Sequence, residues 1–238
     1  MSGGSINSGM ISHSTDPFPY WIIDDFLPTE MAQDAYTYFF DGEGKWTRRH
    51  HLYSRHKETR TTGLSWPVEQ ALRHLESPIV MATLTKLTGI GPLSSDPDRF
   101  GGGQHVTYEG GSLGIHADFT HHPTTGMRRA LNLLLYLNKT VLLGAALELW
   151  DKEVKQCVKR IEPTFNKAVI FATSPTSFHG HPEPLMTRER RSLACYYYVP
   201  ETYTPFDWSR VLRTTDYRPR PWEYGLRLRR WVSKLVKG

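Results

Sequence analysis

Cysteine is scarce in this chain of 238 residues, which contains only Cys157 and Cys195. Two cysteines, each inside a strand-like stretch, exclude the disulfide framework of a small secreted domain and are typical of a reducing compartment. We interpret both as packing residues, because cysteine is among the residue types most often buried. We therefore expect a cytoplasmic protein.

Long apolar runs are also absent. No stretch approaches the roughly 20 apolar residues that a membrane-spanning helix needs, so no transmembrane segment is expected. Residues 1–16 have neither a basic n-region nor an apolar h-region, which argues against an export signal. The triple glycine at residues 101–103 lacks the Lys-Ser/Thr pair of a phosphate-binding loop, which argues against a nucleotide site there.

An excess of positive charge is missing from most of the chain. Residues 1–200 hold 20 Lys and Arg and 20 Asp and Glu, whereas residues 201–238 hold nine Lys and Arg against four Asp and Glu. From Trp222 onward, apolar residues recur roughly on one face of a helix between basic residues. We expect a basic C-terminal extension, residues 201–238, whose helix contacts the rest of the protein, another subunit, or an anionic surface.

The pattern of the remaining residues predicts a mainly β fold with flanking helices. Residues 1–16 are rich in Ser, Gly and Asn and are expected to form a flexible arm before one domain at residues 17–200. A strand is predicted at residues 20–23, with helices after Pro28 and over residues 66–87, the second interrupted at Pro78. Eight further strands, which favour an antiparallel sandwich or barrel, are predicted at residues 104–108, 113–119, 129–137, 146–150, 154–161, 168–172, 177–179 and 192–199.

Residues 46–62 are basic and rich in histidine, without a sustained apolar period. One interpretation is a substrate-binding loop or a second metal site. The other is a solvated, partly extended surface segment, which the lack of closely spaced metal ligands favours.

The strongest candidates for metal ligands are His116 and Asp118. Alternate side chains of an extended strand share a face, so these two can bind one ion together. A third ligand must come from another segment, and His179 is the natural candidate. Two imidazoles and one carboxylate leave other coordination positions open, which is typical of non-heme Fe(II) oxygenases.

Other histidines compete for the third position. His121, His122 and His181 lie near the same segments, and each is either a ligand or a surface residue. His179 is preferred over His181 because the adjacent Gly180 and Pro182 indicate a strand end between them.

A basic strand near residue 190 offers a site for a carboxylate. Arg190 and Ser192 are two residues apart, so on a strand they share a face and can hold a carboxylate by ion pair and hydrogen bond. The planar guanidinium matches a carboxylate with two parallel hydrogen bonds. Arg188 and Arg191 are competitors for this role.

Together these motifs resemble the 2-oxoglutarate- and Fe(II)-dependent dioxygenases of the prolyl-4-hydroxylase-like branch. The family pattern is His-X-Asp, a distal His, and Arg-X-Ser about ten residues later. This chain shows it as His116-Ala117-Asp118, His179 and Arg190-Arg191-Ser192, and the stretches around Tyr108, 129–138 (RALNLLLYLN) and 147–151 (LELWD) also fit. The similarity covers about residues 18–200, with departures at Ala145-Ala146 and at residues 139–141, which lack the usual glycine and tryptophan.

The resemblance implies a double-stranded β-helix, or jelly roll, braced by N-terminal helices. It implies Fe(II) bound by His116, Asp118 and His179, with O2 and the co-substrate 2-oxoglutarate completing the site. It further implies that Arg190 and Ser192 bind the far carboxylate of 2-oxoglutarate, and that Tyr108, Asn132 and Tyr136 contact this co-substrate.

The expected reaction is hydroxylation of an unactivated C–H bond of an amino acid, peptide or small metabolite, with release of succinate and CO2. The carboxylate of Asp118 favours this outcome, because related halogenases have Gly or Ala at that position. The basic loops predict an anionic substrate. The alternative is a catalytically silent jelly-roll module that binds sugar or nucleic acid.

Overall fold

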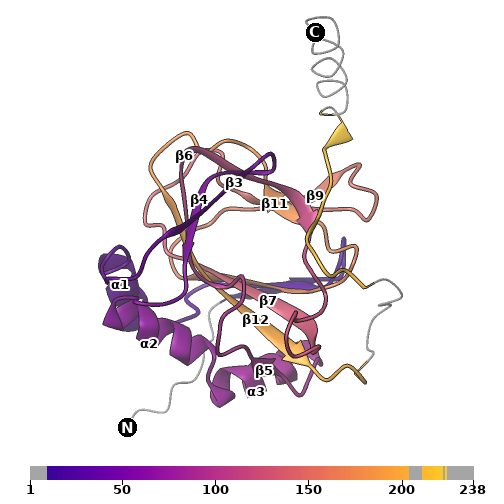
Figure 1. Ribbon diagram of the computed structural model, residues 1–238, viewed down its shortest axis with the longest axis horizontal. Coiled ribbons are helices and arrows are strands. Elements are labelled where there is room, and N and C mark those ends of the chain that lie inside the picture. Colours follow the sequence, from indigo (N-terminus) through magenta and orange to yellow (C-terminus); the bar gives the residue numbers. More distant parts are fainter. Residues whose placement is uncertain (1–9, 204–210, 222, 224–238) are drawn as a thin grey trace, which may run out of the picture.

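The computed structural model describes residues 10–203, 211–221 and 223. Its strands form a curled antiparallel sheet with the order β1-β2-β10-β7-β12-β6-β11-β8-β9 along the main path. Figure 1 shows two layers, with β6 and β11 in one and β7 and β12 in the other. The predicted fold class, mainly β with flanking helices and a double-stranded β-helix, is confirmed.

The elements have the following bounds. The helices are α1 (Thr29–Thr37), α2 (Trp66–Leu75) and α3 (Pro78–Thr88). The strands are β1 (Ile11–Ser14), β2 (Tyr20–Ile23), β3 (Thr47–His51), β4 (Ser54–Arg60), β5 (Ser94–Ser95), β6 (Gly103–Ala117), β7 (Arg128–Tyr136), β8 (Leu147–Trp150), β9 (Cys157–Ile161), β10 (Lys167–Ala172), β11 (His179–His181), β12 (Arg190–Val199) and β13 (Asp216–Tyr217). The predicted interruption at Pro78 is confirmed, since this proline opens α3.

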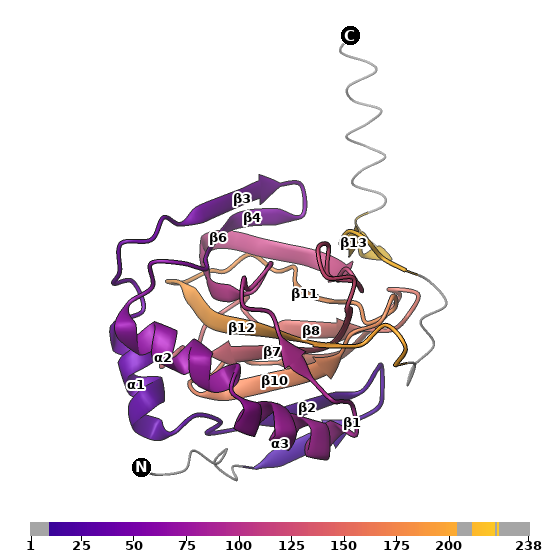
Figure 2. The same ribbon diagram turned by 60° about the horizontal axis from the view of Figure 1, so that its bottom comes forward.

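Strand β7 is covered on both faces, which explains its nearly continuous apolar sequence. Leu131, Leu133 and Leu135 point into the large core that includes residues of α1, α2 and α3. Asn132 and Leu134 point the other way and line the inside of the barrel. Figure 2 shows the three helices along the side of the barrel formed by β12, β7 and β10. The helices therefore cover one layer and leave its inner face for the site.

Strand β6 is a single long strand where the sequence predicted two. Its pairing with β4 shifts register: Arg55 pairs with Ser112, but Lys57 pairs with Thr107. Gly110 has a φ of 73°, in the left-handed region that favours glycine, so the strand bulges here instead of turning. This bulge changes which side chains of β6 face inward.

The sheet extends at both ends beyond residues 17–200. Within the segment expected to be a flexible arm, Ile11–Ser14 form β1 and pair with β2. Within the C-terminal extension, Asp216 and Tyr217 form β13 and pair with β6. Open strand edges offer unpaired hydrogen-bonding groups to any extended segment, which accounts for both additions. The basic helix predicted from Trp222 onward lies outside the described residues.

Residues 46–62 form an antiparallel hairpin of β3 and β4 that pairs with β6. The sequence favoured a partly extended surface segment over a substrate-binding loop or a second metal site. The missing signal is an apolar alternation, since β3 and β4 consist of charged, histidine and small polar residues. It places His51, Ser54, Lys57 and Thr59 at the cavity described below.

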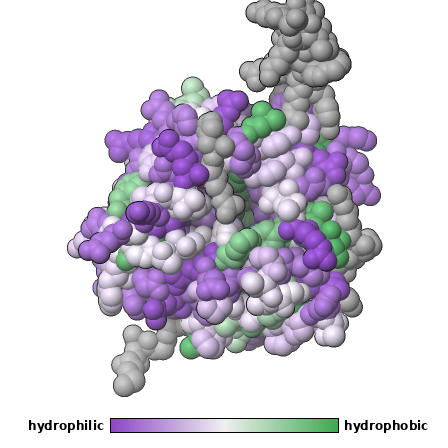
Figure 3. Space-filling model, in the orientation of Figure 1, coloured by the Kyte–Doolittle hydropathy of each residue, from purple (hydrophilic) through white to green (hydrophobic). Residues whose placement is uncertain are grey.

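Hydrophilic side chains cover most of the face shown in Figure 3, and apolar ones occur there in small groups. Among the described residues, none of the helices combines the length and apolar character that crossing a bilayer requires. Both cysteines are free thiols, with Cys195 buried and Cys157 half-buried.

Candidate metal centre

Within residues 10–203, 211–221 and 223, one group of His, Cys, Asp or Glu side chains converges closely enough to hold an ion. It consists of His116, Asp118 and His179, whose ligand atoms all lie within 4.8 Å of one another. Strands β6 and β11 pair so that His116 lies opposite His179. The structure thus brings together the three residues predicted from the sequence.

Both imidazoles are oriented for metal binding. His116 Nδ1 donates to the carbonyl of Gly114 at 2.8 Å, and His179 Nδ1 donates to that of Ser177 at 2.9 Å. With these protons on Nδ1, each Nε2 has a lone pair. The two Nε2 atoms lie 3.7 Å and 3.5 Å from oxygens of Asp118.

Asp118 is held by a buried network. Its Oδ2 accepts hydrogen bonds from Arg129 Nη2 at 3.0 Å and from Asn132 Nδ2 at 2.7 Å. Arg129 Nε donates to Asn132 Oδ1 at 2.6 Å, and the guanidinium stacks 3.3 Å from the ring centre of Tyr196. Oδ1 of Asp118 accepts no hydrogen bond from the described residues. One oxygen is therefore fixed, and the other remains to bind a cation.

The protonation states suit a metal. Burial is the largest cause that lowers the pKa of His116, to about 3. Burial also lowers the pKa of His179. For Asp118, burial opposes the charged form, but the charge of Arg129 and the hydrogen bond from Asn132 favour it, and the pKa lies well below its usual range. Two neutral imidazoles and one carboxylate are the donor set of a facial Fe(II) site, so the residues fit that ion.

The same buried histidines predict acid sensitivity of the metal-free protein. Among the histidines whose pKa values burial lowers, four line the cavity: His105, His116, His179 and His181. For His181 the charge of Arg190 adds to the effect of burial. As the pH falls below about 6.5, the unfolded chain binds protons that the folded chain does not. We expect urea unfolding at pH 5.5 to show a lower free energy of unfolding than at pH 7. Each such histidine contributes up to about 1.4 kcal/mol per pH unit. Equal stability at the two pH values would contradict these neutral, buried states.

Arg190 lies in the same cavity as the metal ligands. It is 5% exposed, its Nε donates to the carbonyl of Ala145 at 3.0 Å, and its Nη2 donates to the hydroxyl of Tyr136 at 3.0 Å. No Asp or Glu side chain of the described residues forms an ion pair with it. A buried guanidinium without a counter-charge is costly unless a ligand supplies one, so this site fits a carboxylate of the co-substrate.

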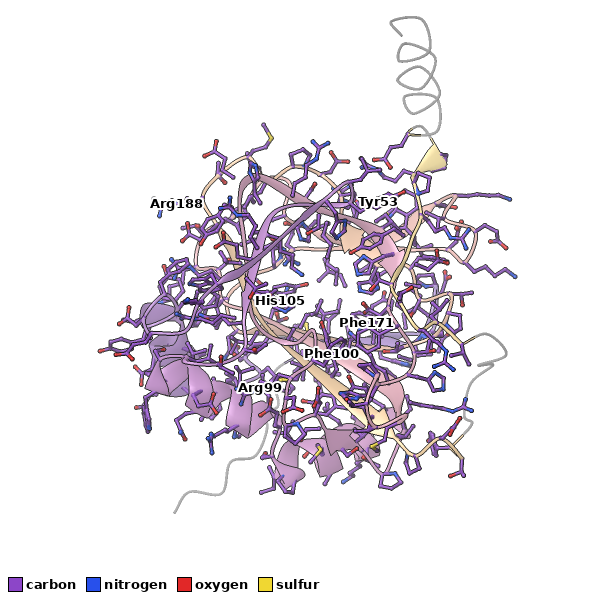
Figure 4. All side chains as sticks on the ribbon, viewed as in Figure 1. Tyr53, Arg99, Phe100, His105, Phe171 and Arg188 are labelled. Atoms are coloured by element: carbon purple, nitrogen blue, oxygen red, sulfur yellow. The ribbon has the colours of Figure 1, made fainter. Side chains whose placement is uncertain are left out.

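The competing arginines point elsewhere. Arg191 lies on the outer face of β12, where it pairs with Glu189 and stacks on Phe40. Arg188 is exposed, and Figure 4 shows it at the outer edge of the molecule, whereas His105 and Phe171 lie toward the inside of the barrel. Ser192 lines the cavity with Arg190, as the alternation on β12 predicts.

The three residues predicted to contact the co-substrate lie in different environments. Tyr108 is absent from the cavity wall: its ring packs against the large core, and its hydroxyl lies 3.5 Å from Glu58. Its contact with the co-substrate stays a prediction, and β6 lines the cavity with His105 instead of Tyr108. Asn132 lines the cavity, but its side-chain amide is engaged by Asp118 and Arg129. Tyr136 is fully buried and contacts Arg190, so it orients the arginine and does not line the cavity.

The three alternative histidines lie outside the converging group of His116, Asp118 and His179. The ring of His122 faces Asp96, with 3.2 Å between Nε2 and the carboxylate, and His121 Nδ1 contacts the hydroxyl of Thr120. His181 lines the cavity but lies outside the converging group. Strand β11 continues through His181, so the strand does not end before this residue.

The C-terminal segment contributes to the cavity wall, which the sequence did not predict. Tyr217 on β13 stacks on Tyr53, with ring centres 4.8 Å apart and an angle of 9° between the planes. Its ring centre also lies 5.2 Å from that of His116. A residue beyond the predicted domain is thus next to a metal ligand.

Comparisons with known proteins agree with this geometry. Residues 103–198 match the family model of the 2OG-Fe(II) oxygenase superfamily. A prolyl-4-hydroxylase from Pseudomonas putida has 17% identity and a TM-score of 0.53, over 76% of this chain and 92% of that one. A prolyl hydroxylase from Trichoplax adhaerens, solved with a peptide fragment of the hypoxia inducible factor oxygen degradation domain, has 18% identity and a TM-score of 0.52, over 75% and 83%.

HygX from Streptomyces hygroscopicus, solved with nickel and 2-oxoglutarate, has 10% identity and a TM-score of 0.54, over 87% of this chain and 94% of that one. No curated protein matches the sequence. At these identities the solved structures show a shared fold, while the matched range of the family model includes His116, Asp118, His179 and Arg190. Residues 103–198 therefore match the 2OG-Fe(II) oxygenase superfamily, and the chain shares its fold with the prolyl-4-hydroxylase from Pseudomonas putida.

Proposed function

We propose that the protein hydroxylates an unactivated C–H bond of an amino acid, peptide or small metabolite. The observation that carries this proposal is one cavity that holds both the cluster of His116, Asp118 and His179 and the guanidinium of Arg190, which forms no ion pair with a described Asp or Glu. When bound, Fe(II), 2-oxoglutarate and O2 supply the oxidising chemistry, and the protein supplies position and shielding.

Each group of the site has a separate task in this proposal. His116, Asp118 and His179 hold Fe(II), while Arg129 and Asn132 fix the orientation of the Asp118 carboxylate. Arg190 binds the far carboxylate of 2-oxoglutarate, and Ser192 lies beside it. Tyr136 and Ala145 hold the guanidinium in place before the ligand arrives. This preorganisation lowers the entropy lost on binding.

The substrate is proposed to carry an anionic group. Lys57 on β4 lines the cavity together with His51 and Tyr217, so a basic and aromatic wall surrounds the approach to the metal ligands. The Trichoplax enzyme was solved with a peptide, which supports a peptide or amino acid as one substrate class. A cytoplasmic location is proposed as well, supported by the two free thiols.

Succinate release in the presence of Fe(II), 2-oxoglutarate and O2 tests the proposal. A panel of amino acids, peptides and small carboxylates is screened, and at least one compound is expected to stimulate succinate formation and to gain one oxygen atom by mass spectrometry. If no compound stimulates turnover and the protein fails to bind 2-oxoglutarate, a silent jelly-roll binding module becomes the better description.

The position of Tyr217 predicts that its substitution changes the KM for the substrate. Tyr217→Ala removes the ring that stacks on Tyr53 above the metal ligands, so we expect KM for the stimulating substrate to rise roughly tenfold, the order expected from a lost aromatic contact. Tyr217→Phe should retain most of the wild-type KM. Tyr203→Ala, which removes a C-terminal tyrosine bonded to Gly89, is the control. Equal KM values for all three variants and the wild type would remove Tyr217 from the substrate site.

A further inference from the structure

His181 is a buried polar side chain that the tasks above do not use. It lies on β11 two residues after His179, so the alternation of a strand points both rings toward the same cavity. It is 2% exposed, and neither Nδ1 nor Nε2 has a hydrogen-bond partner among the described residues. Buried polar groups are nearly always paired, so these two nitrogens require an explanation.

The surroundings of His181 indicate what the partner is. Arg190, His105 and Ser192 line the same cavity, and the charge of Arg190 acts on the His181 ring. A neutral imidazole has one N–H donor and one lone pair. A carboxylate on Arg190 has oxygens left over to accept from a further donor, whereas the protein offers the ring no acceptor of its own.

We propose that His181 donates a hydrogen bond to the carboxylate that Arg190 binds, and so is a second recognition residue for the far end of 2-oxoglutarate. This inference rests on the proposed function. It concerns binding, not the metal, because the ligand atoms that converge on the ion site are those of His116, Asp118 and His179 alone among the described residues.

The inference also explains why an unpaired polar side chain persists at this position. Leucine has a similar size and would remove two buried nitrogens that lack partners in the ligand-free protein. We therefore expect His181→Leu to raise the melting temperature of the ligand-free protein while it weakens co-substrate binding. A side chain that serves only packing would not produce these opposite effects.

The test measures anaerobic binding of two ligands to the Fe(II)-loaded protein by calorimetry. One is 2-oxoglutarate, and the other is 2-oxopentanoate, which has the same chain length but lacks the far carboxylate. For His181→Leu we expect the Kd of 2-oxoglutarate to rise about ten- to a hundredfold, with little change for 2-oxopentanoate. His181→Gln, which retains a donor, should recover part of the loss. His74→Leu is the matched control, because His74 Nε2 is also buried and unpaired but lies on α2, away from the cavity.

The outcomes separate this inference from the proposed function. Unchanged 2-oxoglutarate affinity in His181→Leu, or equal losses for both ligands, would overturn the role of His181 and leave the proposed function intact. Loss of Fe(II) affinity in the variant would instead make His181 a metal ligand and also overturn the inference. Failure of the wild-type protein to bind 2-oxoglutarate would overturn both.

Discussion

Asp118→Ala is expected to lower Fe(II) affinity at least about a hundredfold and to abolish turnover. Asp118 supplies the only carboxylate of the converging group, and the loss of a direct ligand should exceed the effect of removing an outer partner. The variant also leaves Arg129, which is 1% exposed, without its counter-charge. Breaking a buried ion pair in this way costs about 3–5 kcal/mol of folding free energy. Metal titration and urea unfolding of the metal-free protein measure the two effects.

A double variant separates these two effects. Asp118→Ala with Arg129→Met removes both charges, so we expect the free energy of unfolding to recover while Fe(II) affinity stays low. Asp151→Ala is the control for charge: this carboxylate caps a turn after β8 and accepts hydrogen bonds from the backbone of Lys155 and Gln156. An Asp118→Ala protein that binds Fe(II) as tightly as the wild type would exclude the assigned site.

Arg190→Met is expected to weaken 2-oxoglutarate binding by a factor of about thirty to more than a thousand while Fe(II) binding is retained. The range corresponds to about 2–5 kcal/mol for the loss of one partner of a buried, hydrogen-bonded charge pair. Methionine keeps much of the buried volume, so packing against Tyr136 is largely preserved. Calorimetry under anaerobic conditions gives both affinities.

Arg191→Met is the matched control for Arg190→Met. The two arginines are neighbours on β12, but Arg191 faces outward and donates to Glu189 and to the carbonyl of Tyr36. We expect 2-oxoglutarate affinity to be unchanged in this variant. If Arg191→Met weakened 2-oxoglutarate binding and Arg190→Met did not, the opposite face of the strand would line the cavity.

Local periodicity predicted much of the fold and the site. Arg190 and Ser192 lie two residues apart on β12, and Asp118 directly follows the end of β6, two residues after His116. This spacing predicts that each pair shares a face. Pro78 opens α3 because its fixed φ suits the first turn of a helix, and Pro28 directly precedes α1. These features depend only on residues that are close together in the sequence, so they can be predicted from the sequence alone.

Other parts of the site depend on long-range pairing, which no local pattern encodes. The bulge at Gly110 changes the inward face of β6, which moved Tyr108 out of the cavity and His105 into it. Tyr217 reaches His116 only because β13 pairs with an edge of β6. Arg129 had one sequence signal, since a charged residue at the start of an apolar strand must be paired if it is buried. That signal was missed.

The central claim is that His116, Asp118, His179 and Arg190 form one site for Fe(II) and 2-oxoglutarate. The most direct measurement is the visible absorption spectrum of the anaerobic protein during titration with both ligands. We predict a weak charge-transfer band that appears only when Fe(II) and 2-oxoglutarate are present together and that His179→Ala abolishes. A wild-type protein that gives no band at saturating concentrations, or a His179→Ala protein that keeps it, would contradict the account.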